Sequence, residues 1–141
     1  MLLCDISVLN RYGKNKLDEL LSPYKIDWYR LVSILVIYEI PGISQKGLAP
    51  FLQTDKGNIS KLLQQMIDEK LIYRSINEKD NRTKGCYLTD VGTALVPIIS
   101  KVMKDWENLL YQDITKEELT VYEKVSQKIT SNLIQNWEEE K

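Results

Sequence analysis

Apolar residues recur every three to four positions along most of this chain, with polar residues between them. Such spacing gathers apolar side chains on one face of a helix. It predicts six helices, over about 2–21, 27–40, 44–53, 55–69, 91–110 and 115–137. The fourth is the clearest, because Ile59, Leu62, Leu63, Met66 and Ile67 fall at i, i+3, i+4, i+7 and i+8. The pattern therefore predicts a mainly helical protein.

Capping residues support these helix boundaries. Asp27 and Ser44 each precede an apolar periodic segment, as helix N-caps do, and either Thr54 or Asp55 fits the start of the fourth helix. Thr115 to Glu118 has the capping-box pattern and opens the last helix. Thr89-Asp90 marks the start of the fifth. Local capping chemistry and apolar periodicity thus agree.

The segment between the fourth and fifth helices has a different pattern. An apparent strand at 71–76 is followed by DNRTKGCYLTDVG at 80–92, which predicts a β-hairpin with a basic tip leading into a helix. Such a tip is either a solvated turn or a contact for a phosphate backbone or a narrow minor groove. A short helix, a tight turn, an amphipathic helix and a basic hairpin, in this order, favour the second interpretation. Together they predict a winged helix-turn-helix.

The polar face of the fourth helix carries small polar and cationic groups near the helix N-terminus. Side chains of this kind suit the major groove of DNA, although every amphipathic helix has a polar face. The residues are Lys56, Gly57, Asn58, Ser60, Lys61 and Gln64.

The helices at both ends carry more apolar surface than a small winged module can cover. Either they pack on each other within one chain, or they pair with a second copy in a homodimer. We predict a single domain over 1–141, with the winged helix at about 27–90 and dimerisation helices at about 2–21 and 91–137. The fold class is therefore mainly α with a small β-hairpin wing, flanked by N- and C-terminal dimerisation helices.

Composition narrows the function. The chain has 43% hydrophobic and 28% charged residues and no long apolar run, so we expect a cytoplasmic protein without a membrane segment. It contains no histidine, which removes the commonest general base and transition-metal ligand. We expect no enzyme activity, cofactor or metal. The net charge is −1, yet residues 44–89 carry eight cations against five acids, a basic centre compatible with nucleic acid.

The order of elements and several short motifs resemble the MarR family of bacterial transcription regulators, from about Leu17 to Leu133. The carrying motifs are Leu48-Ala49 with Leu52, Ile59-Ser60-Lys61 with Met66, Leu71 to Arg74, Asp80-Asn81-Arg82, Leu88-Thr89 and Gly92. The chain departs from the family pattern at Lys70, where a glycine usually closes the recognition helix. Pro50 and Gly57 also fall within the DNA-binding helices.

The resemblance implies an obligate homodimer whose terminal helices intertwine on a pseudo-palindromic operator in double-stranded DNA. Each recognition helix would occupy a major groove, Arg82 would enter a minor groove with Asp80 as its brace, and Lys84 would contact a phosphate. The DNA-binding residues predicted in total are Ser44, Lys56, Gly57, Asn58, Ser60, Lys61, Gln64, Asp80, Arg82 and Lys84.

The resemblance also suggests two kinds of effector. Some relatives sense oxidants through a thiol near the N-terminal helices, where Cys4 is the candidate, or alternatively a residue with no redox role. Others bind small aromatic acids in a pocket that five aromatic residues could line, unless these simply belong to the core. They are Trp28, Tyr29, Tyr38, Trp106 and Tyr111. We expect a dimeric repressor released by a ligand or oxidant. A winged-helix protein-interaction module is the alternative.

Overall fold

The computed structural model describes residues 1–77 and 80–139, with side chains for 1–76 and 84–136. The chain forms two compact units, Met1–Trp106 and Glu107–Lys141. Helix α6 (Asp90–Leu110) contributes to both units. The described part is mainly helical with one small antiparallel sheet, which confirms the predicted mainly α fold with a small β-hairpin wing.

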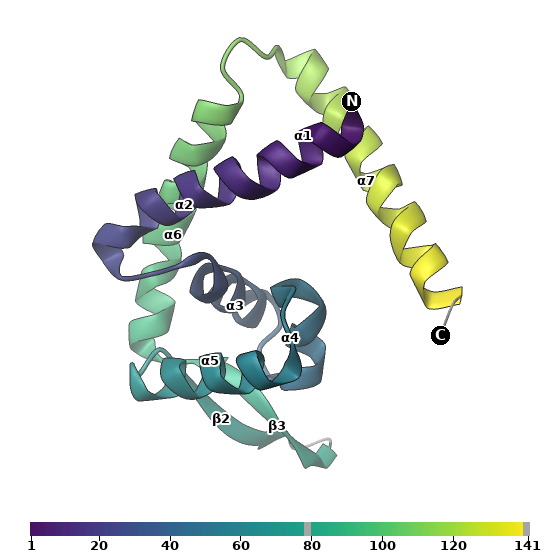
Figure 1. Cartoon of the computed structure of the whole chain (residues 1–141). Helices are drawn as coiled ribbons and strands as arrows, with labels where there is room; N and C mark the ends of the chain where they lie inside the picture. The colour runs from purple at the N-terminus through teal and green to yellow at the C-terminus, as the bar shows by residue number, and fades with distance from the viewer. Residues whose placement is uncertain (78–79, 140–141) are drawn as a thin grey trace. The chain divides into compact units, whose positions relative to one another are not determined.

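The first unit contains the helices and strands of a winged helix-turn-helix (Figure 1). Its N-terminal helices α1 and α2 are joined without interruption by a π-helical segment, Leu9–Gly13. Up to α6 the elements of the chain follow the predicted order, with an additional short strand. They are α1 (Leu2–Val8), α2 (Lys14–Leu21), α3 (Trp28–Glu39), β1 (Ile43–Ser44), α4 (Gln45–Leu52), α5 (Lys56–Asp68), β2 (Ile72–Asn77) and β3 (Asp80–Leu88).

The predicted caps are observed. The carboxylate of Asp27 accepts a hydrogen bond from the Arg30 amide at 2.9 Å, and the Ser44 hydroxyl accepts one from the Gly47 amide at 3.0 Å. At the start of α5 the cap is Asp55, which accepts from the Asn58 amide at 2.8 Å. Each cap satisfies a helix N–H group that has no partner within its own helix.

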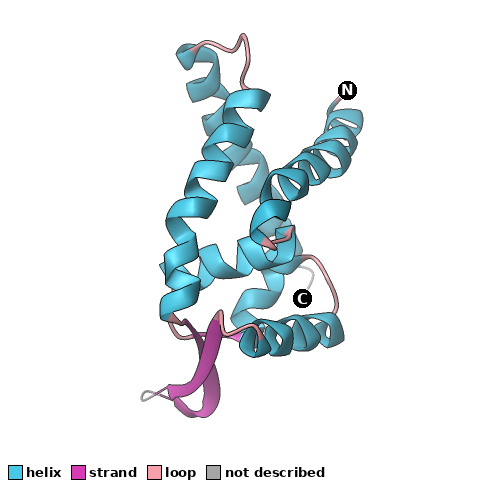
Figure 2. Ribbon diagram, turned by 90° about the vertical axis from the view of Figure 1, so that its left-hand side faces the viewer, coloured by secondary structure: helices cyan, strands magenta, loops and turns pink. Residues whose placement is uncertain are grey.

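The sheet has the order β1-β3-β2, with antiparallel pairs on both sides of β3. The two longer strands, magenta in Figure 2, extend away from the helices of the first unit. Strand β1 was not predicted, because a two-residue strand has no periodicity of its own. It pairs Ile43 with Cys86 and Ser44 with Gly85. Gly85 permits this approach, since a Cβ there would lie 2.5 Å from the carbonyl oxygen of Gly42.

The core of the first unit lies among α3, α4, α5, the sheet and the first part of α6. Ile34, Leu48, Leu63 and Ile99 are fully buried, one from each of the four helices. Cys86 of β3 is fully buried in the same cluster. The wing is thereby anchored to the helices by its base.

Helix α2 is tied to α6 within the first unit. The indole Nε1 of Trp106 donates to the carbonyl oxygen of Gly13 at 3.0 Å. Gly13 ends the π-helical segment, where the regular i to i−4 pattern is interrupted and a carbonyl can accept from another helix.

The base of the wing and the start of α6 meet in a tight cluster, which we call the wing junction: Lys70, Leu71, Thr89 and Gly92. The Thr89 hydroxyl donates to the carbonyl of Lys70 at 2.6 Å and accepts from the Gly92 amide at 3.0 Å. The Thr89 amide donates to the carbonyl of Leu71 at 3.0 Å. A Cβ on Gly92 would lie 2.2 Å from that same carbonyl oxygen, so only glycine fits. The leucine-threonine and glycine motif therefore joins the wing to α6.

Helix α5 ends at Asp68, and a left-handed residue, Lys70, with φ of 62°, follows its C-cap Glu69. The amides of Lys70 and Leu71 donate to the carbonyls of Ile67 and Met66, both at 2.9 Å, which is the Schellman pattern. The turn therefore has the form that a glycine usually adopts, although lysine occupies it. The left-handed conformation costs a residue with a Cβ about 1 kcal/mol relative to glycine.

The second unit contains the end of α6 and the long helix α7 (Lys116–Glu139). The predicted capping box is present: Glu118 N donates to Thr115 Oγ1, and Thr115 N donates to Glu118 Oε1, both at 3.1 Å. These hydrogen bonds hold the pKa of the Glu118 carboxyl below its ordinary value. Among residues 1–77 and 80–139, no helix is long and apolar enough to cross a membrane.

Candidate nucleic-acid interface

Helix α5 presents one apolar and one polar face. Ile59, Leu62, Leu63 and Met66 are buried against the core. The six residues predicted to form its polar face are all exposed: Lys56, Gly57, Asn58, Ser60, Lys61 and Gln64. The apolar contacts therefore determine which side of the helix remains accessible to a partner.

A groove runs between α4, α5 and the sheet, with a volume of about 920 Å³. We call it the basic groove. Among the residues whose side chains the structure describes, four cations and no carboxylate line it. Its lining is Ser44, Gln45, Lys46, Ala49, Thr54, Lys56, Ile59, Ser60, Arg74 and Lys84. Clustered cations of one sign produce a positive potential that attracts phosphate groups.

Gln45 connects three elements around this groove. Arg74 Nη2 on β2 donates to Gln45 Oε1 at 2.8 Å, and Gln45 Nε2 donates to Ser60 Oγ on α5 at 2.7 Å. Ser60 accepts in this contact, so its own hydroxyl hydrogen remains available to a ligand. The side-chain amide of Gln45 thus links the wing to the recognition helix. Sequence reasoning missed this arrangement because Arg74 and Ser60 lie 29 and 15 positions away from Gln45.

Several predicted DNA contacts have partners within their own helix turn. The side-chain amide of Asn58 donates to Thr54 Oγ1 at 3.0 Å and to Asp55 Oδ2 at 3.1 Å, which leaves its carbonyl oxygen for a ligand. Gln64 Nε2 donates to Asp68 Oδ1 at 3.0 Å. These bonds restrict the rotamers of both amides on the exposed face.

The predicted wing contacts lie partly outside the described residues. Lys84 is exposed and lines the basic groove. The side chains of Asp80 and Arg82 fall outside the described residues, although the backbone of β3 is described from Asp80 onward. Their assignment as a minor-groove pair remains a prediction from the sequence.

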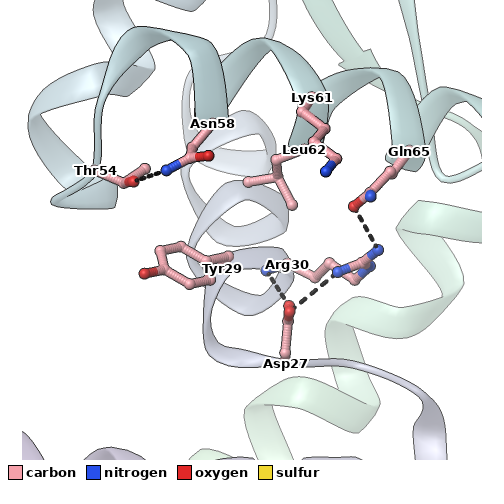
Figure 3. A pocket seen from close by; sticks show the side chains of 8 residues that line it. All are labelled: Asp27, Tyr29, Arg30, Thr54, Asn58, Lys61, Leu62 and Gln65. Carbon is pink, nitrogen blue, oxygen red and sulfur yellow. Dashed lines mark hydrogen bonds and ion pairs between the residues drawn. The ribbon is translucent and has the colours of Figure 1, made fainter.

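A second, smaller groove of about 270 Å³ lies between α3 and α5, and we call it the polar groove (Figure 3). Sequence reasoning did not single out Arg30, whose guanidinium reaches Glu69 and Gln65 near the end of α5. No local pattern predicts a contact across 39 residues. The lining is Asp27, Tyr29, Arg30, Thr54, Asn58, Lys61, Leu62 and Gln65.

The five aromatic residues proposed for a ligand pocket have different surroundings. Trp28 and Tyr29 form an edge-to-face pair with ring centroids 5.4 Å apart, and the ammonium of Lys14 lies 4.2 Å from the centroid of the Trp28 ring. Tyr38 is exposed near the end of α3, and Trp106 bonds to Gly13. Tyr111 belongs to the second unit, where burial raises the pKa of its hydroxyl. A pocket shared by all five remains a prediction.

The two cysteines lie in contrasting environments. Cys4 is exposed on α1, whereas Cys86 is buried in β3. Burial raises the pKa of the Cys86 thiol, and the neighbouring Arg74 partly opposes this shift. Cys86 therefore favours the neutral thiol, which is the less reactive form.

The comparisons with known proteins agree with this geometry. The model of the MarR family matches residues 30–84. A crystal structure of MarR is 26% identical, with a TM-score of 0.87, covering 99% of this chain and 95% of that one. A putative MarR family regulator from Listeria monocytogenes, complexed with 26mer DNA, is 21% identical, with a TM-score of 0.86 over 96% of this chain and 90% of its own. YybA of Bacillus subtilis (strain 168), an uncharacterized HTH-type transcriptional regulator, is 22% identical over 102 residues, 72% of this chain and 68% of its own.

The family match covers most of α3 together with α4, α5 and the hairpin as far as Lys84, and so includes the elements that line the basic groove. The structural likeness extends over nearly the whole chain. The Listeria protein and YybA are transcription regulators, the class of protein that the sequence predicted. Residues 30–84 of this chain therefore match the MarR family, and the fold of the chain resembles that of MarR.

Proposed function

We propose that the protein is a homodimeric repressor that binds a pseudo-palindromic operator and is released by a small ligand or an oxidant. The observation that supports DNA as the partner is the basic groove, where Lys46, Lys56, Arg74 and Lys84 meet beside the polar face of α5. The DNA-bound Listeria relative has the same fold.

The polar face of α5 suits the major groove. It offers a hydroxyl hydrogen at Ser60, an amide carbonyl at Asn58 and two exposed ammonium groups at Lys56 and Lys61. Hydroxyl and amide groups read base edges, while lysines contact phosphates. In this proposal the hairpin places Arg82 in the adjacent minor groove, with Lys84 on a phosphate.

Exposed apolar faces support a homodimer. Leu2, Leu3 and Ile6 of α1 are more than half exposed, as are Val121 and Leu133 of α7. Such surface gains about 25 cal/mol for each Å² removed from water, which favours covering it with a second copy. A palindromic operator also requires a two-fold symmetric reader.

The dimer predicts a sedimenting mass of about twice the 16.4 kDa of the chain at micromolar concentration. Leu133→Lys should weaken association by at least about tenfold, because it places an ammonium group on an apolar interface. Gln135→Lys adds the same charge two positions along α7 and should have little effect. A stable folded wild-type monomer would contradict this part of the proposal.

The effector is the remaining part of the proposed function. An aromatic acid bound near Trp28 and Tyr29, or oxidation of the exposed thiol of Cys4, would have to favour a state with lower DNA affinity. Each is tested by measuring operator release with the compound or oxidant, using Cys4→Ser as the control for the thiol.

A winged-helix module that contacts another protein through the same face is the alternative function. A mobility-shift series over salt concentration distinguishes the two. Suppose that Lys56, Lys61 and Lys84 of each subunit contact phosphates. A plot of the logarithm of DNA affinity against the logarithm of salt concentration should then have a slope of about −5. Absence of salt-dependent binding to DNA from its own promoter region, or to fragments selected by the purified protein, would reject the repressor proposal.

A further inference from the structure

The C-terminal end of the recognition helix α5 is tied to the first turn of α3 by one side chain. Arg30 Nε donates to Glu69 Oε2 at 3.0 Å, and Nη2 donates to Glu69 Oε1 at 2.5 Å. Nη2 also lies 3.4 Å from Gln65 Oε1, while Nη1 donates to Asp27 Oδ2 at 3.1 Å. Figure 3 shows Arg30 directed toward Asp27 on one side and Gln65 on the other.

This contact has the geometry of an orienting clamp. Two parallel bonds between a planar guanidinium and a carboxylate fix direction as well as distance. The side chain of Arg30 is only 16% exposed, so the pair is partly shielded from solvent. The hydrogen bond with Glu69 and the charge of Asp27 raise the pKa of Arg30 above its ordinary value, which favours the charged guanidinium.

The same turn of α3 is joined to the N-terminal helices. The Trp28 amide donates to Asp18 Oδ1 of α2 at 2.7 Å, and the ammonium of Lys14 lies over the Trp28 ring. A continuous set of contacts therefore runs from α2 through the start of α3 to the end of α5. The other end of α5 is held by the Asp55 cap and by Gln45.

We propose that Arg30 is a positioning residue for DNA recognition, which holds α5 through Glu69 and Gln65 at the angle that presents its polar face to bases. This inference rests on the proposed function. Four of the five guanidinium hydrogens are directed to protein acceptors in this arrangement, so Arg30 acts through α5 and does not itself bind a phosphate.

Removing Glu69 tests this role, because positioning and simple electrostatics predict opposite signs. Loss of a carboxylate beside DNA should strengthen binding if charge alone matters. If the clamp orients α5, Glu69→Ala should instead lower affinity for the selected operator by about five- to tenfold. Affinity for an unrelated duplex should stay equal or rise, since phosphate contacts tolerate a tilted helix better than base contacts do.

Asp68→Ala is the matched control, because it removes a neighbouring carboxylate that bonds only along α5, to Gln64, among the contacts described. It should leave operator affinity equal or raised. Arg30→Lys keeps the charge but loses the bidentate geometry, and should resemble Glu69→Ala in its specificity ratio while remaining folded by circular dichroism.

The outcomes separate this inference from the proposed function. If wild type binds its operator but Glu69→Ala strengthens binding as Asp68→Ala does, Arg30 has no positioning role. An unchanged ratio of operator to unrelated-duplex affinity in Arg30→Lys leads to the same conclusion. Wild type without any salt-dependent DNA binding would instead reject the repressor function itself.

Discussion

Gly92→Ala is expected to lower the free energy of unfolding by about 3 kcal/mol, toward the upper end for an overpacked site. The new Cβ would stand 2.2 Å from the carbonyl oxygen of Leu71, well inside van der Waals contact. The obstructing atom belongs to the backbone and accepts the Thr89 amide, so it cannot move without breaking the wing junction. Urea unfolding at a fixed protein concentration measures the loss.

Gly57→Ala provides the control, since it makes the same chemical change in an open position. The nearest atom to its added Cβ is Asp55 Oδ1 at 3.4 Å, an ordinary contact in the first turn of α5. Alanine has the higher helix propensity, so stability should rise by up to about 1 kcal/mol. Equal effects of the two substitutions would show that the close approach at Gly92 is not what requires glycine.

Arg82→Ala is expected to weaken operator binding by about 1 to 3 kcal/mol, which is about 5- to 150-fold. The pairing of β3 with β2 places Leu88 opposite Ile72 at the base of the hairpin and Asp80 opposite Asn77 at its far end. Position 82 therefore belongs to the distal part of β3. A cation presented there gains most from a narrow minor groove, where the negative potential is enhanced.

The measurement is operator affinity at several salt concentrations. Arg82→Ala should also reduce the magnitude of the salt slope. A variant that lacks this groove contact releases fewer counterions from the DNA when it binds. Lys101→Ala removes a cation from the exposed side of α6, where it pairs with Asp105 at 3.0 Å, and should change affinity little. Similar losses for both variants would mean that only net charge matters, and the wing assignment would fail.

Local chemistry explains why so much of the fold was predictable. Helix α5 combines five apolar residues at helical spacing with a capping aspartate, and both signals point to the same element. Ser44 and the Thr115 to Glu118 capping box act within three residues of the helices they start. The sequence could not choose between Thr54 and Asp55. The structure places the cap on Asp55, while Thr54 accepts from the Asn58 side chain.

The candidate site was predictable only in part. The six exposed residues of the α5 polar face followed from periodicity, because the apolar face determines the opposite one. Arg30, Gln45 and Arg74 were not assigned to the site. Their partners lie 15 to 39 positions away, and only the folded chain brings them within hydrogen-bond distance.

The sequence by itself determined the order of helices and hairpin, their caps, and the polar face that α5 shows to solvent. These depend on residues within about one or two helical turns, so a short segment contains the information. Tertiary structure alone decided three things: strand β1, the requirement for glycine at Gly92, and the clamp from Arg30 to Glu69. Each depends on the distance between atoms of distant segments, which packing sets and local pattern does not.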